Sequence, residues 1–136
     1  RSVGRLIDTS ILIESERGRL DLNAFVENCG SEDFFISVVS ASELLHGVHR
    51  ANEPHIRTKR AASVEGVLPQ FSVLDIDLET ARTHARVWAE LEAKGEIIGP
   101  HDLWLAATCV AHGLVMITAN VREFERVPGL TVEVWK

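Results

Sequence analysis

Short apolar runs alternate with longer segments of helical periodicity along the whole chain, and this alternation limits the fold more than any other feature. The apolar runs cover residues 3–7, 34–38, 71–76, 114–118 and 130–135. The segments between them predict helices over residues 8–16, 20–28, 40–52, 56–68, 80–94 and 102–112, with a helical turn at 121–124. Strands separated by helices predict an α/β fold with a mostly parallel five-stranded sheet and helices on both faces.

The composition is that of one soluble domain, which we expect to span residues 1–136. Of the 136 residues, 46% are hydrophobic and 25% are charged, values typical of a globular protein. The net charge of −6 argues against a protein that binds nucleic acid through overall basicity. No apolar stretch approaches the roughly 20 residues that span a bilayer, so we expect no membrane association.

The chain carries only two cysteines, Cys29 and Cys109. Neither belongs to a CxxC or Cys/His motif, so a zinc site or a disulfide framework is not indicated. Cys109 lies within an apolar helical stretch and is expected to be a buried, reduced thiol. With no export signal in the sequence, a cytoplasmic location is the expectation.

Three acidic residues stand where strand-like or helix-like patterns begin or end. Asp8 closes the first apolar run, Glu43 follows the second, and Asp102 opens the helical segment after Gly99-Pro100. In a parallel α/β sheet such boundaries converge at the carboxyl ends of the strands. Carboxylates gathered there without Lys or Arg repel one another, and Mg²⁺ or Mn²⁺ prefers such oxygen ligands. The pattern therefore favours a metal-dependent phosphodiester hydrolase.

Each of the three acids also has a structural interpretation at the start of a helix. Asp8 is a favoured N-cap residue. Ser40-x-x-Glu43 matches a capping box, in which both side chains bond to backbone amides of the first turn. Asp102 would offset the dipole of its helix. However, the apolar residues after Asp102 predict a helix buried nearly all round, which favours a position beside the sheet.

The ordered motifs of the chain resemble those of a PIN domain, and more narrowly the VapC-type toxins of bacterial toxin–antitoxin pairs. The resemblance covers essentially the whole chain. Its motifs are Leu-Ile-Asp8-Thr-Ser, Ser-Ala-Ser-Glu43-Leu-Leu-x-Gly47, Asp102-Leu-Trp-Leu-Ala-Ala, Thr118-Ala-Asn120-Val-Arg-Glu-Phe124 and Val127-Pro-Gly-Leu-Thr-Val.

The resemblance implies a Rossmann-like three-layer α/β/α fold and an endoribonuclease that uses Mg²⁺ or Mn²⁺. It further implies a structured RNA substrate such as tRNA, cleavage to a 5′-phosphate and a 3′-hydroxyl, a VapB-type antitoxin and a homodimer. Asp8, Glu43 and Asp102 match the three principal catalytic, metal-binding acids of the family.

The fourth acid of the family is replaced here by Asn120, which supplies no charge and puts a second metal ion in doubt. Glu123 is the nearest acid that would compensate. Thr118 is expected to orient a ligand or a metal-bound water.

One dense basic segment, residues 50–60, follows the Glu43 region. Arg50, Arg57, Lys59 and Arg60 are its candidate RNA contacts, and an ordinary solvated helix face is the alternative. His101 beside Asp102 is expected to be a helix-start residue rather than a general base. Trp88 and Trp104 are expected to pack in the core, and the segment from Asp77 to Thr80 is expected to cap a helix.

Because of Asn120, a second function stays open: a catalytically weak PIN-like module that binds RNA or a partner. Other phosphotransfer folds fit less well. The dehalogenase-like pattern needs a second Asp where Ser10 stands, and a receiver domain needs a Lys after a late strand, where residues 114–120 contain none.

Overall fold

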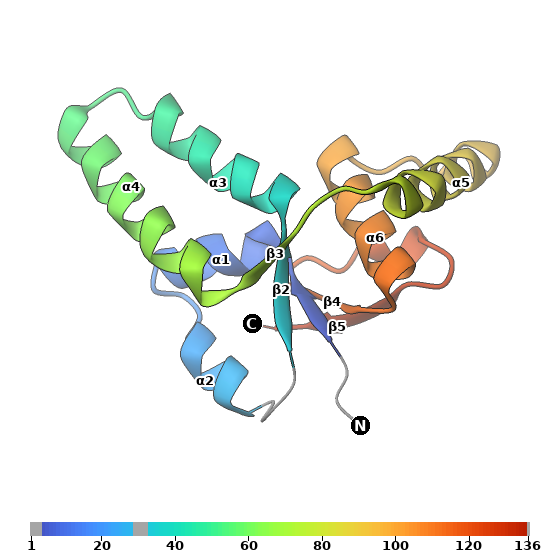
Figure 1. Cartoon of the computed structure of the whole chain (residues 1–136), viewed down its shortest axis with the longest axis horizontal. Coiled ribbons are helices and arrows are strands. Elements are labelled where there is room, and N and C mark those ends of the chain that lie inside the picture. The colour runs from blue at the N-terminus through green and yellow to red at the C-terminus, as the bar shows by residue number, and fades with distance from the viewer. Residues whose placement is uncertain (1–3, 29–32, 136) are drawn as a thin grey trace.

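The computed structural model describes residues 4–28 and 33–135 and consists of one five-stranded sheet with helices on both faces (Figure 1). All paired strands are parallel, in the order β3-β2-β1-β4-β5. The strands are β1 (Arg5–Ile7), β2 (Phe34–Ser37), β3 (Ser72–Leu74), β4 (Val115–Thr118) and β5 (Thr131–Val134). The helices are α1 (Thr9–Glu16), α2 (Leu22–Asn28), α3 (Val38–Arg50), α4 (Pro54–Val67), α5 (Leu78–Lys94) and α6 (Pro100–His112), with the 3₁₀ turns η1 (Leu68–Gln70) and η2 (Phe124–Arg126). The predicted α/β fold is confirmed.

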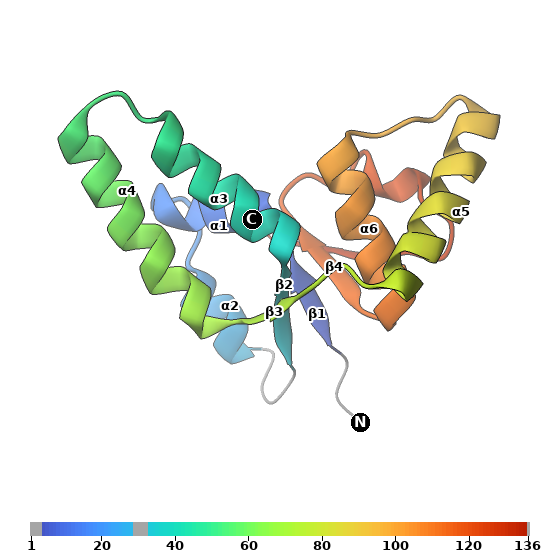
Figure 2. The ribbon, with the colours of Figure 1, turned by 45° about the horizontal axis from the view of Figure 1, so that its top comes forward.

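Alternate residues of the central strands face two separate hydrophobic cores, because successive side chains of a strand point to opposite faces. Leu6 and Met116 pack with buried residues of α5 and α6. Ile7 and Ile117 pack with buried residues of α1, α3 and α4. In both views α5 and α6 accordingly stand apart from the pair α3 and α4 (Figures 1 and 2). The molecule is a three-layer α/β/α sandwich.

The chain changes direction across the sheet between β1 and β4. From β1 it proceeds outward to β2 and β3, and it then returns to β4 on the other side of β1. The carboxyl ends of two strands that separate in this way leave a crevice in open α/β sheets. Asp8 directly follows β1 there, and its backbone amide donates a hydrogen bond of 2.8 Å to the carbonyl of Ile117.

Helix α3 begins at Val38, so the prediction that a helix starts near Ser40 was wrong by one half-turn. Ser37 is the N-cap, and its hydroxyl accepts a hydrogen bond of 3.0 Å from the amide of Val39. Ser40 and Glu43 therefore lie within the helix, which excludes the capping box. Both residues are left free to point toward other elements.

The expected core position of Trp88 was also wrong, since the side chain is 49% exposed. The buried stripe of α5 consists of Thr80, Val87 and Leu91. The packing of α5 against α6 thus buries a different stripe from the one that contains Trp88. Trp104 is half-buried and stacks on His84.

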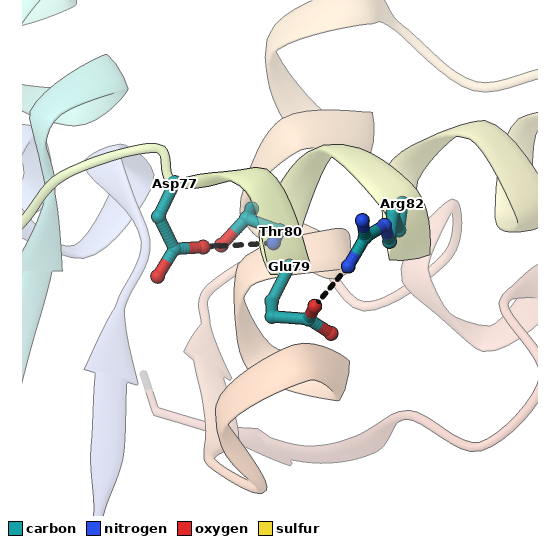
Figure 3. A network of polar contacts seen from close by, with 4 residues as sticks. All are labelled: Asp77, Glu79, Thr80 and Arg82. Carbon is teal, nitrogen blue, oxygen red and sulfur yellow. Dashed lines mark hydrogen bonds and ion pairs between the residues drawn. The ribbon is translucent and has the colours of Figure 1, made fainter.

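The cap expected at Asp77 is confirmed (Figure 3). Oδ1 of Asp77 accepts hydrogen bonds of 2.8 Å from both the amide and the hydroxyl of Thr80. These bonds lower the pKa of the Asp77 carboxyl below its ordinary value. One turn further, Arg82 pairs with Glu79. Helices α5 and α6 end at Gly95 and Gly113, whose φ angles of 68° and 65° favour glycine.

The predictions for the cysteines, for the turn after β4 and for membrane-spanning helices can also be compared with the structure. Cys109 is a buried free thiol, as expected, whereas Cys29 lies outside the described residues. The predicted turn at 121–124 appears as η2, three residues later. Within residues 4–28 and 33–135, no helix is both long and apolar enough to cross a membrane.

Candidate active site

The three predicted acids lie together in one pocket at the carboxyl end of the sheet. The pocket has a volume of about 210 Å³. Its lining comprises Asp8, Thr9, Ser10, Ile13, Glu43, Asp102, Asn120, Glu123 and Phe124. These residues come from α1, α3, α6 and the segment after β4, and none of them is a Lys or Arg. The fold thus gathers negative charge without a fixed cation among the lining residues.

Asp8 is nearly inaccessible to solvent, with 5% of its surface exposed. Oδ2 accepts hydrogen bonds of 2.7 Å from the hydroxyls of Ser10 and Thr118. Burial raises the pKa of the Asp8 carboxyl, these hydrogen bonds oppose the rise, and repulsion by Glu43 adds to it. Although Asp8 occupies the N-cap position of α1, its side chain makes no capping hydrogen bond. The capping interpretation therefore does not account for this carboxylate.

Glu43 is held by side chains from two other helices. The hydroxyl of Thr9 donates a hydrogen bond of 2.8 Å to Oε1 of Glu43 and lies 2.9 Å from the hydroxyl of the buried Ser40. Nδ1 of His101 lies 3.2 Å from Oε2 of Glu43. The carboxylate is thereby directed from α3 into the space between α1 and α6.

Asp102, in the first turn of α6, shares a hydrogen bond with Glu123. Burial, this hydrogen bond and repulsion by Asp8, Glu123 and Glu43 together raise the pKa of the Asp102 carboxyl to about 7. Ionisation of Asp102 beside a second carboxyl group is costly, which favours the protonated form of Asp102. Glu123 therefore adds a fourth carboxyl group to the pocket.

Asn120 and Thr118 occupy different places in the site. Asn120 lines the pocket from an exposed position. Its backbone amide donates a hydrogen bond of 3.0 Å to the hydroxyl of Thr118, which in turn donates to Asp8. Thr118 was expected to orient a ligand or a metal-bound water, and in this structure its hydroxyl orients Asp8.

Two of the basic candidates are engaged with the backbone of the α3–α4 hairpin. The guanidinium of Arg57 donates hydrogen bonds of 3.1 and 2.7 Å to the carbonyl of Ala51, and Arg60 donates one of 3.2 Å to the carbonyl of Gly47. Arg50 and Lys59 are exposed. None of these four residues lines the acidic pocket.

Sequence reasoning missed Ser10 and Thr9 as site residues. Ser10 follows Asp8 by two positions, and its hydroxyl also accepts a hydrogen bond of 3.2 Å from the amide of Ala119. The Asp-Thr-Ser sequence could have predicted their role, because the hydroxyl groups of Thr and Ser can donate hydrogen bonds to a neighbouring buried carboxylate.

The donor set suits a hard divalent cation, because it consists of carboxylate, hydroxyl and amide oxygens. Burial, together with repulsion between the acids, raises the pKa of Asp8 and Asp102, and added positive charge in the pocket would offset both effects. In the structure, Asp8, Glu43 and Asp102 each contact different polar side chains. Among the described residues, no three His, Cys, Asp or Glu side chains are drawn together closely enough to hold an ion. Coordination therefore requires the carboxylates to turn inward.

Comparison with known proteins agrees with this fold. A model of the PIN domain matches residues 5–130. The chain is 38% identical over 130 residues to Ribonuclease VapC1 of Rickettsia felis, covering 96% of this chain and 95% of that relative. It is 36% identical over 108 residues to the tRNA(fMet)-specific endonuclease VapC of Salmonella typhimurium, with coverages of 79% and 80%.

A solved structure gives the same result. The DNA-bound VapBC of Salmonella typhimurium contains a chain that superimposes with a TM-score of 0.88 at 31% identity, covering 98% of this chain and 99% of that one. The chain therefore belongs to the PIN-domain family, among the VapC ribonucleases.

Proposed function

We propose that this protein is a Mg²⁺- or Mn²⁺-dependent endoribonuclease and the toxin of a toxin–antitoxin pair. The observation that carries the proposal is the pocket of four carboxyl groups, Asp8, Glu43, Asp102 and Glu123, whose lining includes no Lys or Arg. The names of the VapC relatives, a ribonuclease and a tRNA-specific endonuclease, support the same activity.

In this proposal Asp8, Glu43 and Asp102 hold the metal ion, and Asn120 and Glu123 are auxiliary. Such an ion supplies an activated water molecule and neutralises charge on the scissile phosphate. Ser10 and Thr118 hold the Asp8 carboxylate through its Oδ2 atom. Thr9 and His101 contact Glu43, which would have to turn inward to reach the ion. Because Asn120 brings no charge, we assign one firmly held ion and make no assignment of a second.

The test is cleavage of a mixture of tRNAs by the purified protein with Mg²⁺ or Mn²⁺ and with EDTA. Asp8→Asn, Glu43→Gln and Asp102→Asn are each expected to remove most cleavage while the folded state persists. Asp75→Asn is the matched control, because Asp75 is an exposed acid just after β3 that lies outside the pocket.

The outcomes separate the two functions. Full activity in any two of the three pocket variants contradicts the assignment of the site. If the wild-type protein binds RNA and cleaves none with either ion, the chain is a PIN-like binding module in which Asn120 has weakened the acid cluster.

The proposal includes a VapB-type antitoxin, a homodimer and a single domain over residues 1–136. Support comes from the Salmonella typhimurium structure, which is a VapBC complex. Expression of this chain alone is expected to arrest growth, and co-expression of the cognate antitoxin is expected to relieve the arrest. Mapping of new 5′-monophosphate ends after induction identifies the RNA.

A further inference from the structure

A cluster of three aromatic side chains lies on the α5–α6 hairpin, outside the acidic pocket. His84 stacks on Trp104, with ring centroids 3.5 Å apart and an angle of 16° between the planes. Trp88 meets His84 edge-on, with centroids 5.7 Å apart at 62°. Trp88 has this one ring contact and is 49% exposed. One edge of its ring thus packs on His84, and the side chain still presents surface to solvent.

The cluster is continuous with the acidic pocket through α6. His101, which contacts Glu43, precedes Trp104 by three residues, so the two lie on the same side of the helix. Helix α6 also supplies Asp102 to the pocket from its first turn. Trp104 stands in the next turn of that helix, so the aromatic cluster lies on the hairpin that borders the acids.

The chemistry of the cluster suits a flat, uncharged ligand. Partial burial lowers the pKa of His84, so its imidazole is neutral near pH 7 and stacks without the cost of desolvating a charge. The cations nearby on α5 are paired, Arg82 with Glu79 and Arg86 with Glu90. The contact that the cluster itself offers is stacking on an aromatic face.

The surroundings of Trp88 suit one ring better than a protein-sized interface. Neighbours on its exposed side of α5 include Ala85 and Glu92, and acidic residues are depleted from the cores of protein interfaces. The other large apolar residue exposed on α5 is Leu78, about 15 Å away along the helix, and Ile76 and Ile97 are exposed just outside its two ends. A stable protein interface needs about 800 Å² from each partner, far more than one indole supplies.

We propose that the cluster of His84, Trp88 and Trp104 is a stacking platform that receives an unpaired base of the RNA, close to the bond that is cleaved. The inference rests on the proposed function, since it takes RNA as the ligand. Base–aromatic stacking tolerates any base, because every base has a π-face. The platform would therefore select unpaired nucleotides, in a loop or at an end, over a continuous duplex.

The experiment measures binding of a fluorescent single-stranded RNA by anisotropy in EDTA, where no cleavage occurs, with the full-length chain. Trp88→Ala is expected to weaken binding roughly ten-fold or more, and Trp88→Phe is expected to retain most of the affinity. Ile97→Ala is the matched control, because Ile97 is a more exposed apolar residue in the loop that joins the two helices. The loss in Trp88→Ala should persist at high salt, because stacking releases no counterions.

A series of RNAs with one abasic nucleotide provides the second measurement. One abasic position should weaken binding to the wild-type protein and leave binding to Trp88→Ala unchanged. The proposed stacking platform is contradicted if the abasic position weakens binding equally in both proteins. It is also contradicted if Trp88→Ala binds RNA with unchanged affinity. If Trp88→Ala instead changes the oligomeric state at unaltered RNA affinity, Trp88 is a contact with a second copy of the chain.

Cleavage kinetics keep this inference distinguishable from the proposed function. With Mg²⁺, Trp88→Ala should raise KM and leave kcat near the wild-type value, because the acids are untouched. If the wild-type protein binds RNA through Trp88 without cleaving it, the proposed function fails and the platform stands. If Asp8→Asn abolishes cleavage while Trp88→Ala changes neither KM nor RNA affinity, the platform fails and the proposed function stands.

Discussion

At the scale of single residues, the most constrained group is the Asp8 carboxylate. Its Oδ2 atom accepts hydrogen bonds from Ser10 and Thr118, which arrive from α1 and from the end of β4. These contacts stabilise a buried charge that desolvation disfavours. They also hold the carboxylate in one orientation.

Ser10→Ala removes one of these two donors without adding bulk. We expect the cleavage rate to fall on the order of 10- to 100-fold, as is usual when a side chain that orients a ligand is lost. The rate under saturating RNA with Mg²⁺ is the measurement. Ser42→Ala, at an exposed position of α3, is the control and should cleave normally. Wild-type rates in Ser10→Ala would show that Thr118 alone positions Asp8.

Asp102 makes the stability of the metal-free protein depend on pH. Its pKa is raised from 3.8 to about 7 in the folded state. Between these values the folded chain binds the proton that the unfolded chain has lost, so stability falls as the pH rises and stays low above pH 7. The Asp102→Asn side chain does not ionise, so it avoids the cost of a buried negative charge at high pH. In EDTA it should be more stable than the wild type at pH 8, by about 1–2 kcal/mol after allowance for solvent screening.

Urea unfolding of both proteins at pH 4.5 and pH 8 measures this difference. The advantage of Asp102→Asn should be small at pH 4.5, where most of the wild-type side chain is protonated in the folded state. An equal difference at the two pH values would mean that the wild-type carboxyl titrates at its ordinary pKa.

At the scale of elements, the α3–α4 hairpin shows why a basic pattern is ambiguous in sequence. Arg57 lies in a segment that resembles an RNA-binding strip, yet its guanidinium binds the carbonyl of Ala51 just after α3. Carbonyls at the end of a helix lack partners within the helix. The spacing of basic residues does not reveal whether a carbonyl or a phosphate is within reach, because that depends on the angle between the helices.

Arg57→Ala is therefore expected to act on stability. Loss of hydrogen bonds from a charged donor at a partly buried carbonyl should lower the free energy of unfolding by about 1 kcal/mol or more. RNA affinity of the folded variant should stay close to that of the wild type. Lys59→Ala, on the exposed side of α4, should change stability little. A large loss of RNA affinity with unchanged stability in Arg57→Ala would instead support the RNA contact.

At the scale of the whole molecule, the parallel sheet brings together acids that are far apart in the chain. The order β3-β2-β1-β4-β5 puts the ends of β1 and β4 side by side. Helices α3 and α6 then start from the same edge on opposite faces, which supplies Glu43 and Asp102 (Figure 2). The pocket is thus a property of the topology, and its excess of negative charge makes a cation a natural stabiliser.

A divalent ion is accordingly expected to stabilise the folded chain through the pocket. At a concentration 100 times its dissociation constant, a ligand that binds only the folded state stabilises it by about 2.7 kcal/mol. Mg²⁺ or Mn²⁺ should raise the thermal midpoint of the wild-type protein, and EDTA should reverse the rise. Asp8→Asn should respond weakly, and the Asp75→Asn control should respond as the wild type does. An equal response in Asp8→Asn would place the ion elsewhere.

The sequence by itself determined the fold class, the approximate segments and the three acids that the structure places in one pocket. These are local properties, since apolar periodicity and an acid after a strand depend on neighbouring residues. The exact start of α3 and the buried face of α5 became known only from the tertiary structure, which places the N-cap at Ser37 and buries Thr80, Val87 and Leu91.

Tertiary structure alone also decided how the acids are held. The pairing of Asp102 with Glu123, the hydroxyls on Asp8 and the contact of His101 with Glu43 join residues from separate elements. The physical reason is that a buried carboxyl takes its pKa and direction from whichever groups surround it in space. Those groups are chosen by strand order and helix packing, which no local pattern encodes.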